Sequence, residues 1–300
     1  MKKFLLAMIM AATTITASAR EQITLVYSWG FGDSIAGINR ALVKEANEIQ
    51  DRYHFLFDAK PGAGGSIAAN HVAKAPNTIL ISSSAFYIRP VVYPNESYDL
   101  SRYQVLLTQF DCPMAITAGK YDAWSKLPQD RPLTIGTSGL GVTTHLAATQ
   151  IQARYKNMQV VPFKATSESL LSAVSGQTDL HVAFLSEPEA WSKNDSRNLH
   201  VLGITGRTAV KQYQPLVNQG FPAILGDMNV PFQLIVPADF PADKYHEIRE
   251  ILQKAMKSRS VKDLYAIDYC TGTEDRRDMK AFFKSQSDMW RRLASGVKVN

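Results

Sequence analysis

Four segments rich in glycine, serine or threonine stand between a strand-like and a helix-like stretch of the sequence. A helix start has unpaired backbone N–H groups and about half a positive charge. Glycine lets a ligand come close to those groups, and hydroxyls add neutral donors. Together they can bind a carboxylate or phosphate without a buried cation. The residues expected to contact a ligand are Ser28, Trp29, Phe31, Asp33, Gly64, Gly65, Ser66, Ser83, Ser84, Thr137, Ser138, Gly141 and Thr143.

The same segments have a second interpretation as turns and helix caps. Asp33, Ser66 and Thr143 are of the types preferred at helix N-caps, and this explains any one segment taken alone. Nucleotide motifs fit poorly, because Gly62–Ser66 lacks the Gly-Lys-Ser/Thr of a P-loop and Gly139-x-Gly141 lacks the third glycine of a dinucleotide fingerprint. The prediction of an anion site therefore depends on several such segments occurring in both halves of the chain.

Two side chains close to these segments could also act on a ligand. His145 follows the last glycine segment at a helix start, where it either contacts the ligand or has a structural role. Lys164 follows a strand and could add a charge-assisted hydrogen bond to an acid, or it could be a solvated surface lysine.

The sequence favours a binding protein over an enzyme. Its six histidines show no His-Glu-x-x-His spacing, and it has no Gly-x-Ser-x-Gly nucleophile motif. We therefore expect no catalytic residue, no cofactor and no metal. The alternative of a secreted enzyme that acts on a small acid would depend on His145.

Strands and helices alternate between the glycine segments. The order at 22–82 is β-α-β-α-β, which implies a mainly parallel sheet with helices on both faces, and a second such unit covers 133–204. A strand at 232–236 and two helices with apolar residues at helical spacing follow. Expected strands are 22–27, 53–57, 78–82, 133–136, 160–162, 179–184, 199–204 and 232–236; expected helices are 34–47, 66–75, 144–155, 167–175, 241–257 and a last one around 279–293.

A chain of 300 residues is long for one core and suits two lobes. Candidate crossings between the lobes lie near Gly119–Lys120 and Asn229–Val230. They give a first, discontinuous lobe at 20–119 plus 230–300 and a second lobe at 120–229. Ligands bind at the carboxyl ends of parallel strands in such folds, so the glycine segments are expected at those edges.

The N-terminus predicts export. Lys2 and Lys3 precede an apolar run that is too short to span a bilayer, and Ala17-x-Ala19 is typical of a signal peptidase site. Residues 1–19 are thus expected to be a signal peptide and the mature chain to be periplasmic. The net charge of +6 is spread along the sequence, which argues against a nucleic-acid partner.

Cys112 and Cys270 are the only cysteines. An oxidising compartment would allow one disulfide, but the sequence leaves open whether the two meet.

Six segments resemble the solute-binding proteins of tripartite tricarboxylate transporters, also called the Bug family. The most specific is Pro61–Ala75, a Pro-Gly-Ala-Gly-Gly-Ser loop with its helix, and the match extends over nearly the whole mature chain. The other five segments are Tyr98–Leu100, Gly136–His145, Val161–Lys164, Ser175–Asp179 and Leu202–Gly206.

This resemblance implies a two-lobed periplasmic binding protein of the Venus-flytrap, type II-like class. It implies that a di- or tricarboxylate or a related organic acid is held in an interlobe cleft by the loops at 28–33 and 137–143. The partners it implies are that acid and a membrane permease, with the receptor expected to be a monomer. A binding protein that serves a sensor kinase or receptor is the alternative.

The first loop departs from the family pattern. The family has Pro-Gly-Gly-x-x-Asp followed by Arg, whereas this chain has Trp29-Gly30-Phe31-Gly32-Asp33, with Arg40 displaced from that spacing. Trp29 and Phe31 would narrow the pocket or give it an apolar wall.

Overall fold

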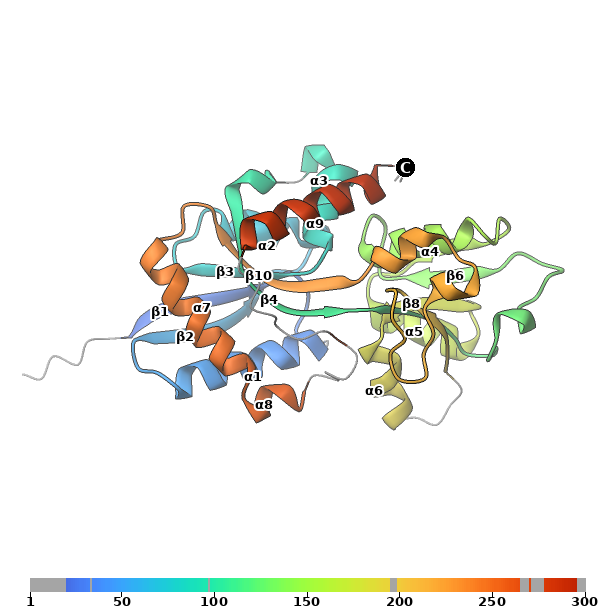
Figure 1. The fold of residues 1–300 in the computed structure, drawn as a ribbon, viewed down its shortest axis with the longest axis horizontal. Coiled ribbons are helices and arrows are strands. Elements are labelled where there is room, and N and C mark those ends of the chain that lie inside the picture. The colour runs from blue at the N-terminus through green and yellow to red at the C-terminus, as the bar shows by residue number, and fades with distance from the viewer. Residues whose placement is uncertain are drawn as a thin grey trace, which may run out of the picture.

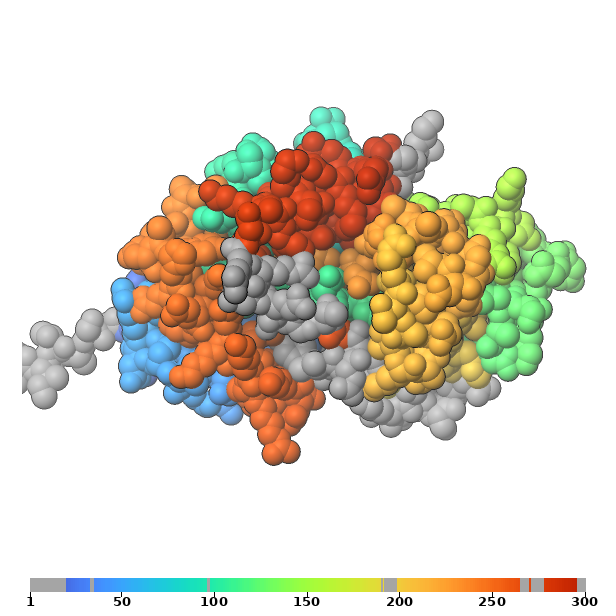
Figure 2. All heavy atoms as spheres, viewed as in Figure 1, coloured from blue at the N-terminus to red at the C-terminus, as the bar shows by residue number. Residues whose placement is uncertain are grey.

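The computed structural model describes residues 20–32, 34–96, 98–194, 199–264, 270 and 278–295, which form two lobes (Figure 1). The predicted signal peptide lies outside the described residues. Each lobe contains one five-stranded sheet. Figure 2 shows the lobes side by side, with the first and last parts of the chain in one and the middle part in the other.

The first lobe has the strand order β2-β1-β3-β10-β4. β1 pairs in parallel with both β2 and β3, while β10 is antiparallel to β3 and β4. Four of the five strands therefore run in one direction, and the expected mainly parallel sheet is confirmed. The strands are β1 (Glu21–Tyr27), β2 (Tyr53–Ala59), β3 (Thr78–Ser82), β4 (Tyr103–Cys112) and β10 (Val230–Pro237).

Among the described residues, six α-helices belong to the first lobe, and the apolar faces of α1 and α9 follow the sequence pattern. Ile35, Ile38, Leu42 and Ala46 of α1 are buried, and Trp290 of α9 is fully buried. All residues of β3 are buried, as expected for a central strand covered on both faces. The helices are α1 (Ser34–Glu48), α2 (Ser66–Val72), α3 (Ala85–Val92), α7 (Ala242–Met256), α8 (Arg259–Lys262) and α9 (Met279–Ala294).

The second lobe repeats this architecture, with the strand order β7-β6-β8-β5-β9. Here β5 is the one strand that runs against the others. Its strands are β5 (Met114–Ala118), β6 (Thr134–Thr137), β7 (Gln159–Pro162), β8 (Leu180–Phe184) and β9 (His200–Ile204), and its helices are α4 (Thr143–Gln152), α5 (Thr166–Ser175) and α6 (Ser186–Asn194).

Two adjacent strands carry the chain between the lobes. β4 ends at Cys112, which pairs with Val230 at the start of β10 (Figure 1). Because β5 pairs with β8 and β9, the first crossing lies at Pro113, earlier than the boundary near Gly119 that the sequence suggested. Only Pro113 separates the two strands within residues 103–118. The sequence therefore shows little sign that the chain leaves the first lobe there.

Cys112 and Cys270 form a disulfide, with their Cα atoms 4.3 Å apart. This settles the question that the sequence left open. Cys270 also packs against the buried residues Ala115, Leu185 and Ile204 of the second lobe. The disulfide therefore fastens the chain before α9 to the first crossing between the lobes.

Candidate functional site

The two lobes meet where β3 leads into α3 and β6 leads into α4. Ser84 Oγ and Thr143 Oγ1 lie 2.5 Å apart across this junction. Both side chains are buried. The structure thus brings together two residues, one from each lobe, that were selected from the sequence as ligand contacts.

The β6–α4 loop makes hydrogen bonds with itself. The Ser138 N–H donates to Thr144 Oγ1 at 3.1 Å, and the Gly141 N–H donates to His145 Nδ1 at 3.2 Å. Thr137 Oγ1 donates to the Gly139 carbonyl at 3.2 Å. Two of the N–H groups expected to bind an anion therefore already have acceptors, which are side chains in the first turn of α4.

The first turn of α4 still has N–H groups to offer. Its N-cap is Val142, whose apolar side chain cannot accept hydrogen bonds from these N–H groups. Thr143 is the first helical residue rather than the N-cap proposed in the capping interpretation. The N–H groups of Thr143, Thr144 and His145 precede the first intrahelical bond, from Leu146 N–H to the Val142 carbonyl. An anion placed here would meet these donors and the positive end of the helix dipole.

His145 is 7% exposed, and burial lowers its pKa, so the ring is neutral at pH 7. Because Nδ1 accepts from Gly141, the proton of the neutral ring is on Nε2. His145 therefore holds the glycine loop through Nδ1.

The first two loops of the first lobe lie against each other beside the end of β3. The Ser28 hydroxyl donates to the Ile81 carbonyl at 3.0 Å. A Cβ on Gly65 would lie 3.4 Å from the Ser28 Cβ, so the second glycine loop packs directly on the first. Ser66 Oγ is buried there without a hydrogen-bond partner among the described residues. Ser66 is the first residue of α2, and Gly65 occupies the N-cap.

The second glycine loop has an unusual backbone. Residues 62–65 all have positive φ, including Ala63 at 47°. A Cβ on Gly64 would lie 3.3 Å from Cδ of Arg89. The glycine therefore makes room for this arginine, whatever else it does for a ligand.

Arg89 is a residue that the sequence analysis missed. It is 8% exposed, and its guanidinium carbon lies 3.7 Å from the ring centre of Tyr93. A Cβ on Gly141 of the other lobe would lie 2.8 Å from both Tyr93 and Val92. A buried cation thus lies behind the interlobe contact. The available signal in the sequence was one charged residue in the otherwise apolar segment 85–92, which follows three serines.

Aromatic side chains lie at and beyond the carboxyl ends of β1 and β2. The Phe31 ring meets Phe57 edge-on at 5.6 Å, and Trp29 lies 5.5 Å from Tyr27. Arg40 Nη1 donates to the Phe31 carbonyl at 3.3 Å, which holds the loop from the side of α1. Asp33 lies outside the described residues.

The remaining candidates have different surroundings. Ser83 is buried, and its hydroxyl accepts from the Ala85 N–H at 3.4 Å. Lys164 is exposed in the β7–α5 loop, where its backbone N–H donates to Glu168 at 3.2 Å. These contacts give Ser83 a role at the start of α3, while the Lys164 side chain is directed to the surface.

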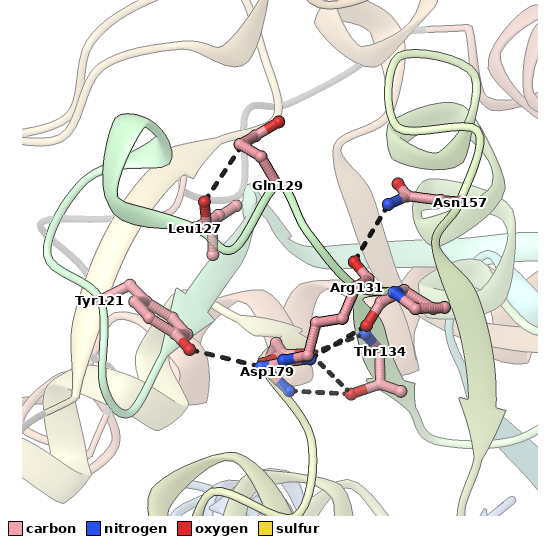
Figure 3. A network of polar contacts seen from close by, with 8 residues as sticks. Tyr121, Leu127, Gln129, Arg131, Thr134, Asn157 and Asp179 are labelled. Carbon is pink, nitrogen blue, oxygen red and sulfur yellow. Dashed lines mark hydrogen bonds and ion pairs between the residues drawn. The ribbon is translucent and has the colours of Figure 1, made fainter.

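The Ser175–Asp179 segment has a structural role at the other end of the strands (Figure 3). The Asp179 carboxylate accepts from two Arg131 nitrogens at 2.9 and 2.5 Å and from the Thr134 N–H at 2.9 Å. Thr134 begins β6 and Asp179 directly precedes β8. This cluster therefore lies at the strand ends opposite the β6–α4 loop.

A shallow hollow on the second lobe lies far along α4 from the candidate site. It is at the carboxyl end of the helix, where the dipole disfavours an anion. Its lining residues are Trp124, Ser125, Gln129, Arg154, Tyr155, Lys156 and Asn157. We therefore place the candidate site at the amino end of α4.

Within the described ranges, no group of His, Cys, Asp or Glu side chains is arranged to hold a metal ion. The helices of that part of the chain are also too short or too polar to cross a membrane.

Solved structures share this fold over most of the chain. An R. palustris protein with adipate is 19% identical, with a TM-score of 0.80 and coverage of 91% of this chain and 96% of that one. The periplasmic binding protein BugD is 18% identical, with a TM-score of 0.80 and coverage of 93% and 98%. MatC from Rhodopseudomonas palustris, with bound malate, is 14% identical, with a TM-score of 0.76 and coverage of 91% and 99%.

The two-lobed periplasmic binding protein class expected from the sequence is thereby confirmed. No curated protein shows a significant sequence match. The family model described as "Tripartite tricarboxylate transporter family receptor" matches residues 40–298. The chain therefore belongs to the receptor family of the tripartite tricarboxylate transporters.

Proposed function

We propose that this protein is a periplasmic receptor that binds a small carboxylate between its lobes and delivers it to a membrane permease. The observation that carries the proposal is the meeting of Ser84 and Thr143 at the uncapped start of α4. Two relatives of the same fold were solved with adipate and with malate, which supports an acid as the solute.

In this proposal the carboxylate takes the place of the direct contact between the two hydroxyls. Its oxygens accept from the first-turn N–H groups of α4 and from Ser84 and Thr143. The helix dipole and the charge of Arg89 nearby add to the attraction for an anion. Because the donors come from both lobes, the ligand favours the closed arrangement over the open one.

The family is one of receptors, and we propose binding without turnover. His145 is engaged with the loop backbone through Nδ1, and burial keeps the ring neutral. It therefore acts by fixing the glycine loop. The remaining sequence candidates in the loops at 28–32 and 64–66 would contact the rest of the solute.

Titration calorimetry of the purified protein with adipate and with malate tests the proposal. An acid at about 100 times its dissociation constant should also stabilise the fold by about 2.7 kcal/mol. Thr143→Val removes one donor to a charged group, which is worth about 1.5–3 kcal/mol, or roughly a tenfold to hundredfold loss of affinity.

Thr149→Val is the matched control, since it is the same substitution in the same helix. The Thr149 hydroxyl donates to the Leu146 carbonyl at 2.7 Å, away from the helix start. Its affinity for the acid should equal that of the wild type. Binding of a sugar or nucleotide with no response to any acid would refute the proposal.

A further inference from the structure

Three large apolar side chains are exposed on or directly beside the loops proposed to hold the solute. Phe31 is 50% exposed, Ile67 51% and Leu140 39%. Among the described residues, only two other large apolar side chains are similarly exposed, those of Leu171 and Leu264. Exposed apolar residues are common singly, but three on adjoining ligand loops indicate a surface that something covers.

The surroundings of Phe31 and Ile67 hold them in place. The Phe31 ring is fixed edge-on against Phe57, and Arg40 binds the Phe31 carbonyl. Ile67 lies over Gly62, where a Cβ would come within 2.7 Å of its Cδ1. Because Gly65 packs on Ser28, the segments that carry Phe31 and Ile67 are neighbours in the first lobe.

Leu140 is the exposed apolar residue of the second lobe. It directly precedes Gly141, where a Cβ would lie 2.8 Å from Tyr93 and Val92 of the first lobe. Three residues further on, Thr143 begins α4 and meets Ser84. The exposed leucine is therefore next to both the interlobe contact and the proposed carboxylate position.

We propose that the solute is an amphipathic carboxylate with an apolar body, such as an aromatic ring or a chain of several methylenes. The proposal rests on the function proposed above and specifies the solute for the same site. The carboxylate binds at the start of α4, and the apolar body covers Phe31, Ile67 and Leu140. A small hydroxy acid has no apolar surface that would remove these three side chains from water.

The test is titration calorimetry with unbranched monocarboxylates from butyrate to octanoate, with phenylacetate, and with malate and citrate. Each added methylene should tighten binding roughly fourfold until the apolar surface is covered. Phenylacetate should bind more tightly than malate or citrate. The heat-capacity change on binding should become more negative along the series, as burial of apolar surface requires.

Phe31→Ser should reduce the gain in affinity per methylene, while Leu264→Ser, an equally exposed side chain outside these loops, should keep it. Phe31 is half exposed, so its replacement should leave the fold intact, and an unchanged melting temperature checks this.

If malate or citrate binds more tightly than every monocarboxylate and Phe31→Ser changes no dissociation constant, the amphipathic solute is refuted while the carboxylate receptor stands. If none of these acids binds, the carboxylate receptor is refuted, and this proposal with it.

Discussion

Replacing Asp179 by asparagine tests whether the Ser175–Asp179 segment supports the fold and leaves ligand binding untouched. The Asp179 side chain is 8% exposed and accepts from Arg131, from the Thr134 N–H and, at 3.1 Å, from the Thr134 hydroxyl (Figure 3). The bonds tie the connection before β6 to the start of β8. Asparagine has the same size but loses the charge and turns one acceptor into a donor.

The expected loss follows from these contacts. A hydrogen bond to a charged partner contributes about 1.5–3 kcal/mol. The Arg131 side chain is 47% exposed and can be solvated when its partner is lost, so the lower part of that range applies. We expect a loss of about 2 kcal/mol, which in a protein of this size lowers the melting temperature by about 3–4 °C.

The effect should also depend on pH. Burial raises the pKa of Asp179, but the hydrogen bonds from Arg131 and Thr134 outweigh it, and the net pKa is below the ordinary value. As the pH falls, the unfolded chain takes up the proton first. The contribution of Asp179 is therefore complete at neutral pH and is lost as the pH falls through the folded pKa.

Thermal denaturation followed by circular dichroism, from pH 7 down to pH 3, measures both effects. Asp122→Asn is the control, because Asp122 makes an exposed ion pair with Lys126 at 2.7 Å. Its melting temperature should stay within about 1 °C of the wild type. An Asp179→Asn variant that melts like the wild type but binds acid more weakly would show that the segment serves the ligand.

Three further predictions concern other parts of the fold. Replacing Cys112 and Cys270 together by serine should destabilise the protein by up to about 5 kcal/mol in chemical denaturation, since the disulfide spans 158 residues. Burial lowers the pKa of His181 to about 3, so stability should fall with pH below about 6.5 by up to about 1.4 kcal/mol per unit, and His181→Gln should flatten this slope. Gly141→Ala should weaken acid binding in calorimetry, because its Cβ would press on Tyr93 and its φ is +64°.

Helices and strands with one buried face could be predicted from the sequence, because their apolar residues recur at the period of the element. In α1, for example, Ile35, Ile38 and Leu42 recur at helical spacing and are all buried. Helix α3 was missed, since Ala85–Val92 is apolar nearly throughout, contains Pro90 and so shows no amphipathic period. Strand β5 was missed for the same reason, as its residues are all buried.

The candidate site could be predicted in its residue types but less well in their roles. Glycine and hydroxyl residues mark strand-to-helix junctions, and this identified Ser84 and Thr143 without showing that they touch. Which N–H groups stay available depends on tertiary geometry: only the fold shows that His145 accepts from Gly141. The contact of Gly64 with Arg89 likewise joins residues that are distant in the sequence.

The division of donors between the lobes has a consequence for affinity. The N–H groups of Ser138 and Gly141 donate to side chains in the first turn of α4, so few donors are left for an anion. Of these, the Ser84 hydroxyl belongs to one lobe and the start of α4 to the other. A ligand with equal affinity for the open and the closed arrangement would not shift the equilibrium between them, however tightly it bound. If the carboxylate binds as proposed, each lobe alone offers an incomplete site, and affinity depends on how readily the lobes close as well as on the contacts made after closure.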